Sequence, residues 1–110
     1  MIDWKRVADL RDEIGSEDFE EVLPLFLEEV LGVMDTLRDA PDLSRLEEDM
    51  HFLKGAALNL GFEAFTNLCS AGEKAAAAGQ ASTVNLAEII DCFEVSRATF
   101  DAGLAQGAAA

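Results

Sequence analysis

The chain has 110 residues, of which half are hydrophobic and only 2 are proline, and its formal net charge is −14. This length is most simply one domain, too short for a kinase and a substrate domain together, and the composition is typical of a soluble all-helical protein. The negative charge argues against sequence-independent binding to nucleic acid or to an anionic membrane surface, because both need basic patches.

The N-terminal part predicts a short helix followed by a long one. We expect Asp3 to cap a helix over about residues 3–11, and Ser16 to cap a second helix that runs to about residue 38. Pro24 predicts a kink rather than two helices, since the apolar spacing continues in phase across it. The expected core stripe of the long helix is Phe19, Leu23, Phe26, Val30, Val33 and Leu37, and a second line of Leu27, Leu31 and Met34 would pack against another neighbour or form a binding patch.

A helical hairpin is predicted next. Asp42 should cap a helix over residues 43–60, and Gly61 should end it in the left-handed conformation. The following helix, over residues 62–78, starts at once, and so short a connection forces the two helices to be antiparallel. The expected inward residues are Leu46, Met50, Leu53, Ala57 and Leu60 in the first helix, and Phe65, Leu68, Cys69, Gly72 and Ala76 in the second.

A last helix completes the predicted fold. It should begin after a loop, with Ser82 or Thr83 as its cap, and run to about Leu104, while residues 105–110 fray. The sequence therefore predicts an all-α fold, an antiparallel four-helix bundle over about residues 17–104 with a short additional N-terminal helix. The expected inward residues of the last helix are Leu86, Ile89, Ile90, Phe93, Phe100 and Leu104.

The two cysteines, Cys69 and Cys92, lie in apolar helical patterns without CxxC spacing or a second histidine nearby. They indicate free thiols in a reducing compartment rather than a zinc or redox site. The first residues lack the basic and apolar regions of a signal peptide, and no apolar run approaches transmembrane length. We therefore expect a cytoplasmic protein.

His51 is the only histidine, and it begins a stretch to Phe62 without an acidic residue. At about 100° per residue, its side chain lies roughly 140° from the centre of the core stripe and faces out. Lys54 and Gly55 follow at i+3 and i+4, so the ammonium can reach an atom held by the imidazole. A glycine inside a helix costs about 1 kcal/mol relative to alanine, and the approach of a partner is one reason to accept that cost.

Glu73 is a second candidate for this site. The fold back about Gly61 should bring Glu73 near His51, where its carboxylate could accept from Nδ1–H and leave Nε2 as the nucleophilic lone pair. Glu73 could equally be a solvated acid that pairs with Lys74 or another surface base. The sequence leaves both interpretations open, and without context an exposed histidine would be an ordinary surface residue.

The string His51-x-Leu53-Lys54-Gly55 closely resembles the histidine-containing phosphotransfer (HPt) domain family. The resemblance covers about residues 17–100 and includes Leu60-Gly61, nine and ten residues after the histidine, and Cys69 in the next helix. It implies that Nε2 of His51 takes a phosphoryl group from the aspartyl phosphate of one receiver domain and passes it to another. It further implies that Lys54 helps to hold the phosphate, Gly55 gives access and Gly61 closes the hairpin, while a glutamate matches Glu73 in some relatives, notably the phosphotransfer domains of chemotaxis kinases.

The sequence departs from the family pattern at two places. Ala56 and Ala57 replace the small hydroxyl pair common after the glycine, which removes hydroxyl contacts near the phosphate. Phe65 stands where an aliphatic residue is more usual. The first departure affects fine positioning, the second only packing, and neither removes the nucleophile.

The resemblance also implies the partners. These are response-regulator receiver domains and a sensor histidine kinase, with Mg²⁺ supplied by the receiver and no cofactor of the chain's own, because no carboxylate cluster beside His51 makes a metal site. Phe52 and Leu58 are candidate docking contacts, although either could be ordinary partial burial. We expect a monomer that binds neither nucleic acid nor membrane and, without a nucleotide-binding motif, is a carrier rather than an enzyme.

Two other functions stay open at this point. The main one is a four-helix interaction module that docks signalling partners without phosphotransfer, although a pure docking module needs no nucleophile. A helical hydrolase or metalloprotein is the other, but the chain offers a single histidine and no second ligand cluster.

Overall fold

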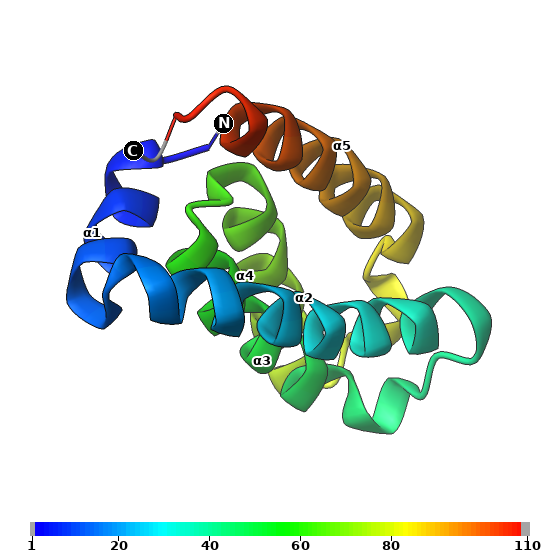
Figure 1. The fold of residues 1–110 in the computed structure, drawn as a ribbon. Helices are drawn as coiled ribbons and strands as arrows, with labels where there is room; N and C mark the ends of the chain where they lie inside the picture. The colour runs from blue at the N-terminus through cyan, green and yellow to red at the C-terminus, as the bar shows by residue number, and fades with distance from the viewer. Residues whose placement is uncertain (1, 109–110) are drawn as a thin grey trace.

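Helices make up the structure, a computed structural model that describes residues 2–108. In that span the α-helices are α1 (Trp4–Ile14), α2 (Ser16–Asp39), α3 (Leu46–Leu60), α4 (Glu63–Ala77) and α5 (Leu86–Ala105), with 3₁₀ turns at Leu43–Arg45 and Ala81–Thr83. In Figure 1, α2 crosses the front of the molecule, α5 lies above it, and α3 and α4 lie behind. The predicted all-α bundle with an additional N-terminal helix is confirmed.

The caps of the helices match the prediction in part. Asp3 caps α1, since its carboxylate accepts the Arg6 N–H at 3.2 Å. Gly15, with φ of +88°, stands at the start of α2, so the expected Ser16 cap is wrong and Ser16 is the first helical residue. Asn85 caps α5 by accepting the Glu88 N–H at 3.1 Å.

Two element boundaries differ from the prediction for local reasons. Neither Ser82 nor Thr83 caps α5, because both lie in the 3₁₀ turn, where the Thr83 hydroxyl donates to the Gln80 carbonyl at 2.7 Å. Asp42 does cap the next element, but that element is a 3₁₀ turn, and α3 begins only at Leu46. At the other end of the chain, residues 106–108 form a hydrogen-bonded turn after α5, and the rest of the predicted frayed tail, residues 109–110, lies outside the described residues.

The inward face of α2 differs from the predicted stripe. Leu27 and Met34, expected in a second line, are buried in the core, whereas Leu23, Phe26 and Val33 are only half-buried. The physical reason is that α2 contacts α1, α3 and α5, so the residues buried along it are those that face these three helices. The helix continues through Pro24 without interruption.

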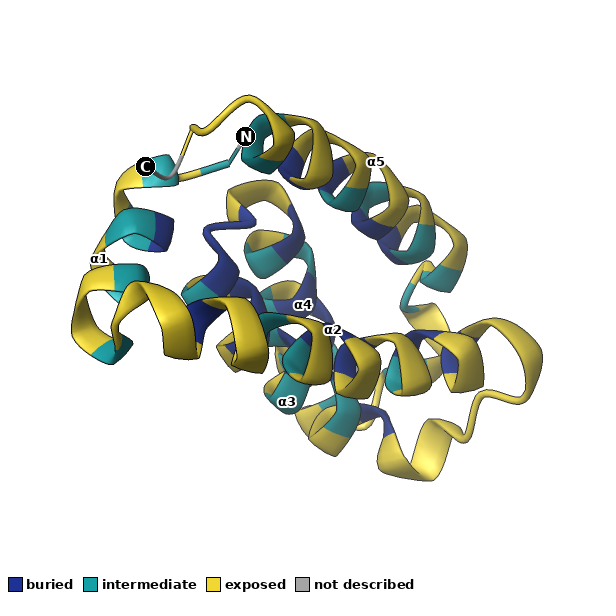
Figure 2. Cartoon of the chain, viewed as in Figure 1, coloured by how far each residue is buried: buried dark blue, intermediate teal, exposed yellow. Residues whose placement is uncertain are grey.

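The core lies between α2, α3, α4 and α5, and the residues coloured as buried in Figure 2 lie mainly on the sides of these helices that face one another. All five inward residues predicted for α3 are buried. In α4 and α5 about half of the predicted inward residues are buried, whereas Leu68, Ala76, Leu86, Ile90 and Leu104 are only partly buried.

The turn between α3 and α4 depends on Gly61. Its φ of +72° is the left-handed conformation predicted from the sequence, and a Cβ here would collide with the backbone carbonyl of Asp3. The Gly61 carbonyl accepts the Asp3 N–H at 2.7 Å. The turn therefore fixes the antiparallel hairpin and also anchors the start of α1.

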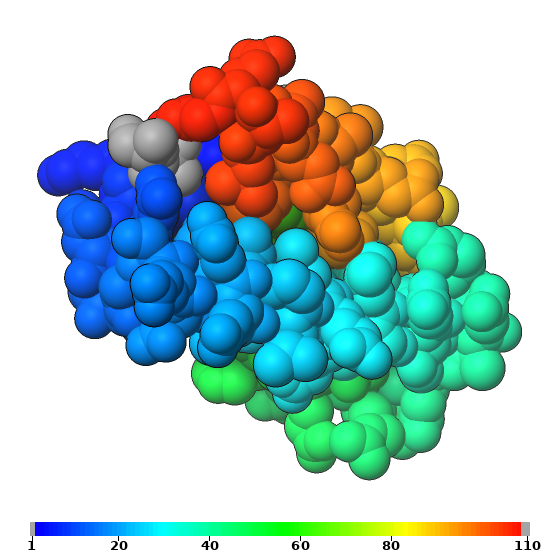
Figure 3. Space-filling view, in the orientation of Figure 1, coloured from blue at the N-terminus to red at the C-terminus, as the bar shows by residue number. Residues whose placement is uncertain are grey.

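The first helix closes one end of the bundle beside the C-terminal part of α5 (Figure 3). Trp4 stacks on Phe100 with ring centroids 5.6 Å apart and planes 3° from parallel. Its indole covers Gly103, where any Cβ would collide with the ring. A glycine at this position therefore allows α1 to lie against α5.

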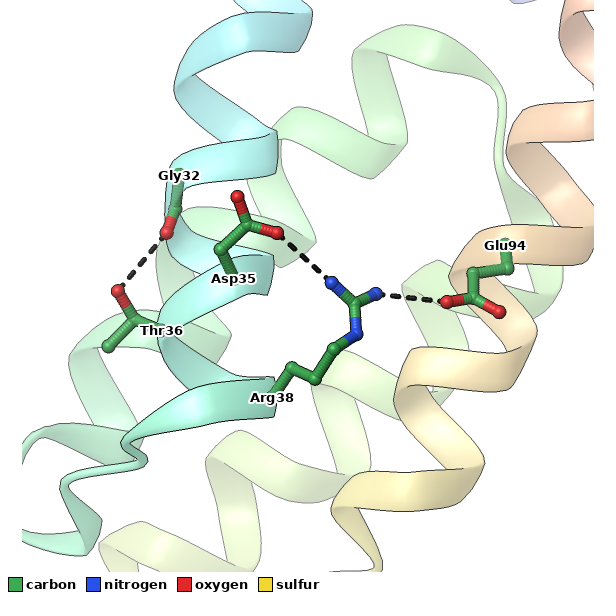
Figure 4. A network of polar contacts seen from close by, with 5 residues as sticks. All are labelled: Gly32, Asp35, Thr36, Arg38 and Glu94. Atoms are coloured by element: carbon green, nitrogen blue, oxygen red, sulfur yellow. Dashed lines mark hydrogen bonds and ion pairs between the residues drawn. The ribbon is translucent and has the colours of Figure 1, made fainter.

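An exposed polar network joins α2 to α5 at the other end (Figure 4). Arg38 contacts Asp35 at 3.0 Å within α2 and Glu94 of α5 at 2.9 Å. Exposed ion pairs of this kind contribute at most about 1 kcal/mol. The buried core therefore holds the two helices together, and the network adds little.

In the described part of the chain, no helix is long and apolar enough to cross a membrane.

Candidate functional site

His51 lies on the outer surface of α3, and 72% of its side chain is exposed. Its neighbours Met50 and Leu53 are completely buried and hold this part of the helix against the core. Because the positions next to His51 point inward, the helical period of about 100° per residue turns the imidazole to solvent. The predicted outward direction of His51 is confirmed.

Glu73 of α4 lies opposite His51 and contacts two side chains of α3. Its Oε2 is 2.9 Å from Nδ1 of His51, and its Oε1 is 2.5 Å from Nζ of Lys54. The Glu73 side chain is only 20% exposed. Of the two interpretations left open by the sequence, the structure thus shows a carboxylate engaged with α3 across the hairpin.

These contacts determine where the protons lie. The hydrogen bond from Lys54, and then that from His51, hold the pKa of Glu73 below its ordinary value of 4.5, so the carboxylate is ionised at neutral pH. An ionised carboxylate can only accept, and Nδ1 of His51 must therefore carry the proton. In the neutral imidazole, Nε2 is left with its lone pair, on the side of the ring away from Glu73.

Gly55 lies one turn after His51 in the interior of α3. A Cβ added here would meet nothing within 4 Å. Neither internal packing nor a special backbone angle requires a glycine at this position, since its φ is not positive. The bare backbone beside His51 therefore leaves open space outside the helix.

The two departures from the family pattern, the alanine pair and Phe65, lie in the core. Ala56 and Ala57 are both buried, so their methyl groups face other helices rather than the imidazole. Phe65 is buried as well, with its ring centroid 5.2 Å from that of Phe93. In this chain the alanine pair therefore bears on helix packing more than on the atoms around His51.

The two predicted docking contacts differ in exposure, and α2 carries further exposed apolar residues. Leu58, two turns after His51, is exposed, whereas Phe52 is partly buried and packs against the core. On α2 the structure adds Val22 and Leu25, which are 48% and 67% exposed and were not singled out from the sequence. The sequence pattern that could have pointed to Val22 and Leu25 is their three-residue spacing outside the expected core stripe.

Metal ligands do not gather at this site. Among residues 2–108, no group of three or more His, Cys, Asp or Glu side chains is placed to hold a metal ion. Cys69 is buried, and burial together with nearby Cys92 raises its pKa to about 12. It is therefore a protonated core thiol rather than a metal-binding thiolate.

In a comparison with family models, residues 21–102 match the model described as the Hpt domain. This span is well over half of the chain and includes the whole of α3 and α4, but α1 lies before it. No curated protein and no solved structure matches the chain.

Proposed function

Because this chain belongs to the histidine-containing phosphotransfer (HPt) domain family, we propose that His51 is the residue that carries the phosphoryl group. Members of the family transfer phosphoryl groups on histidine in phosphorelays and lack kinase activity of their own. The observation that supports His51 most directly is its geometry: an exposed imidazole whose Nδ1 is engaged by Glu73, with Nε2 open to solvent.

The transfer step follows from this geometry. Nε2 attacks the phosphorus of an aspartyl phosphate on a receiver domain, a P–N bond forms in line with the breaking P–O bond, and the aspartate leaves as a carboxylate. The reverse reaction delivers the phosphoryl group to a second receiver. The proton stays on Nδ1 throughout, and the charge that develops on the ring is offset by the Glu73 carboxylate 2.9 Å away.

Lys54 and Gly55 have supporting roles in the proposal. Lys54 is one turn from His51 and already beside Glu73, so its ammonium can turn from that carboxylate toward phosphate oxygens on Nε2. Gly55 lets the receiver approach the helix backbone, since no side chain occupies the space next to His51. Phe52, next to His51, and Leu58, two turns further along α3, would contact the same receiver.

The chemistry of the partner completes the site. We propose that Mg²⁺ enters with the acidic pocket of the receiver, where it neutralises the phosphoryl oxygens. The absence of acidic residues from His51 to Phe62 suits this, because an acidic pocket can approach that stretch without repulsion. A cytoplasmic location, a monomeric state and a sensor histidine kinase upstream belong to the same proposal.

The test uses the protein and its His51→Gln variant. Each is incubated with several receiver domains that have been phosphorylated on aspartate, and acid-labile phosphate on the chain is then measured. We expect label on the wild-type protein and none on the variant. If no receiver gives His51-dependent label although receivers still bind, the chain is instead an interaction module that docks partners without exchange.

A further inference from the structure

Gly72 lies in the interior of α4, directly before Glu73, and it is buried. Its φ is not positive, so the backbone conformation does not require a glycine here. A glycine inside a helix is less favourable than an alanine, because more backbone entropy is lost when it is ordered. The reason for a glycine at this position must therefore lie in the space that a side chain would occupy.

That space is bounded by Met50 of α3. A Cβ added to Gly72 would lie 3.0 Å from Sδ and 3.2 Å from Cγ of Met50, closer than ordinary van der Waals contact. The same Cβ would lie 3.6 Å from Cγ1 of Val84, which is an ordinary contact distance. An alanine would therefore require either Met50 or α4 to move by a few tenths of an ångström.

Met50 has little freedom to make that movement. Its side chain is completely buried, and so are those of Leu46 and Leu53 on the neighbouring turns of α3. Protein interiors are packed about as densely as organic crystals, so the displacement of one enclosed side chain displaces others. Because the distance between two packed helices depends on the side chains at their contact, Gly72 sets how close α4 comes to α3 at this level.

The pair Met50–Gly72 lies beside the pair His51–Glu73. Each residue of the second pair directly follows one residue of the first, a step of about 100° around its helix axis. Because α3 and α4 are antiparallel, this step turns both side chains to the same side of the helix contact. The close approach at Gly72 therefore lies next to the hydrogen bond of 2.9 Å between Nδ1 of His51 and Oε2 of Glu73.

This hydrogen bond leaves little tolerance for a change in the distance between the helices. N–H···O bonds have heavy-atom distances of about 2.7–3.2 Å. A displacement of α4 by a few tenths of an ångström would lengthen the contact from 2.9 Å to the upper end of that range. The same movement would draw Glu73 away from Lys54, the second partner of its carboxylate.

We propose that Gly72 is a positioning residue of the phosphotransfer site: by letting α4 approach Met50, it holds Glu73 within hydrogen-bonding distance of Nδ1 of His51. Gly72 touches no reacting atom and acts only through Glu73. The inference rests on the proposed function of His51, but the state of the imidazole can be measured without any phosphate donor.

The experiment compares Gly72→Ala with two matched variants that add the same methyl group to other helices. A Cβ at Gly32 of α2 meets nothing within 4 Å, and a Cβ at Gly103 of α5 collides with the Trp4 ring. Gly32→Ala thus controls for helix propensity, and Gly103→Ala controls for a loss of packing between α1 and α5.

Three quantities are measured for each protein. ¹⁵N NMR gives the fraction of the neutral His51 ring that carries its proton on Nδ1, and ¹³C NMR gives the pKa of Glu73. Phosphoramidate, a small-molecule donor, gives the rate at which His51 is phosphorylated without a receiver. The two NMR measurements report the geometry of the site, whereas the rate reports its chemistry.

We expect Gly72→Ala to lower the Nδ1-protonated fraction of His51 and to move the pKa of Glu73 up toward its ordinary value of 4.5. Phosphorylation should slow by about threefold to tenfold, because a ring with its proton on Nε2 has no lone pair there. Gly32→Ala and Gly103→Ala should leave all three measurements as in the wild type. Met50→Ala in the Gly72→Ala background removes both contacting atoms and should restore the tautomer, although the cavity it creates makes the protein less stable.

An unchanged His51 tautomer and an unchanged Glu73 titration in Gly72→Ala would overturn the proposal, since α4 would then keep its place without the glycine. So would an equal change in Gly103→Ala, because a general loss of packing would be the cause. A folded double variant that keeps the altered tautomer would contradict the role of Met50. If the NMR results are as expected but neither phosphoramidate nor a phosphorylated receiver labels wild-type His51, the positioning role stands and the proposed function fails.

Discussion

Lys54 and Glu73 form an ion pair across the α3–α4 hairpin, with Nζ 2.5 Å from Oε1, and the second oxygen of the same carboxylate lies 2.9 Å from Nδ1 of His51. One acidic side chain thus contacts both the imidazole and the ammonium one turn further along α3. Each partner of Glu73 can therefore be removed separately, and the effect on the others measured.

The first prediction concerns the titration of Glu73. Its pKa is lowered chiefly by the hydrogen bond from Lys54 and secondly by that from His51, so its ¹³C chemical shift should titrate below the ordinary value of 4.5. Lys54→Ala should raise the midpoint more than His51→Gln does. Because the folded-state pKa is the lower one, the contacts stabilise the fold above pH 4.5, and this contribution is lost as the pH falls through the lowered pKa. A midpoint at or above 4.5 in the wild type would contradict the observed contacts.

The second prediction separates function from stability at Lys54. Lys54→Ala should slow phosphotransfer by at least about tenfold, because it removes a cation from developing negative charge. The free energy of unfolding should change by less than about 1 kcal/mol, as expected for a partly exposed ion pair. Lys74→Ala is the matched control, since it removes an exposed lysine next to Glu73 in sequence and should leave transfer unchanged. A large loss of stability in Lys54→Ala would show that Lys54 is structural.

Gly55 provides the third prediction, in which stability and activity change in opposite directions. Gly55→Ala should raise the free energy of unfolding by about 0.5–1 kcal/mol, because its Cβ meets nothing and alanine favours the helix. Transfer should become slower, since the methyl group occupies the approach to His51. Gly32→Ala in α2, where a Cβ is equally unobstructed, should give a similar gain in denaturant titration without loss of transfer. Equal transfer rates for both variants would remove the proposed role of Gly55 in access.

The fourth prediction tests how α1 is held. Gly103→Ala should lower the free energy of unfolding by about 1–3 kcal/mol, because the added Cβ collides with the Trp4 ring. In a Trp4→Leu background the same substitution should cost much less, and a double-mutant cycle by thermal or denaturant unfolding measures the difference. Additive effects of the two substitutions would show that the indole does not need the glycine.

The last prediction concerns the thiols. Burial, with a contribution from nearby Cys92, raises the pKa of Cys69 to about 12, so at pH 8 almost no thiolate is present there. Iodoacetamide should modify partly exposed Cys92 first and modify Cys69 only as fast as the protein opens. Peptide mass spectrometry of a time course gives both rates. Equal rates in the folded protein would mean that Cys69 is not enclosed by the core.

Helical periodicity and capping preferences, which act within one segment of the sequence, determined much of α3 and its end. The helical period of α3 was enough to predict five of its six buried residues, all but Ala56, and the outward direction of His51. Gly61 is equally local, because a left-handed helix end favours glycine whatever surrounds it. Lys54 and Gly55 follow from i+3 and i+4 spacing on the same helix.

Tertiary packing decided the features that depend on how two or more helices lie against each other. The apolar residues of α2 are spread over more than half of the circumference of the helix. Only the positions of α3 and α5 made Leu27 and Met34 core residues and left Val22 and Leu25 exposed. The partners of Glu73 depended on the register of the hairpin, which spacing fixes to about a turn but not to hydrogen-bonding distance. The close approach of Gly72 to Met50 joins two helices, so no periodicity within one of them could predict it.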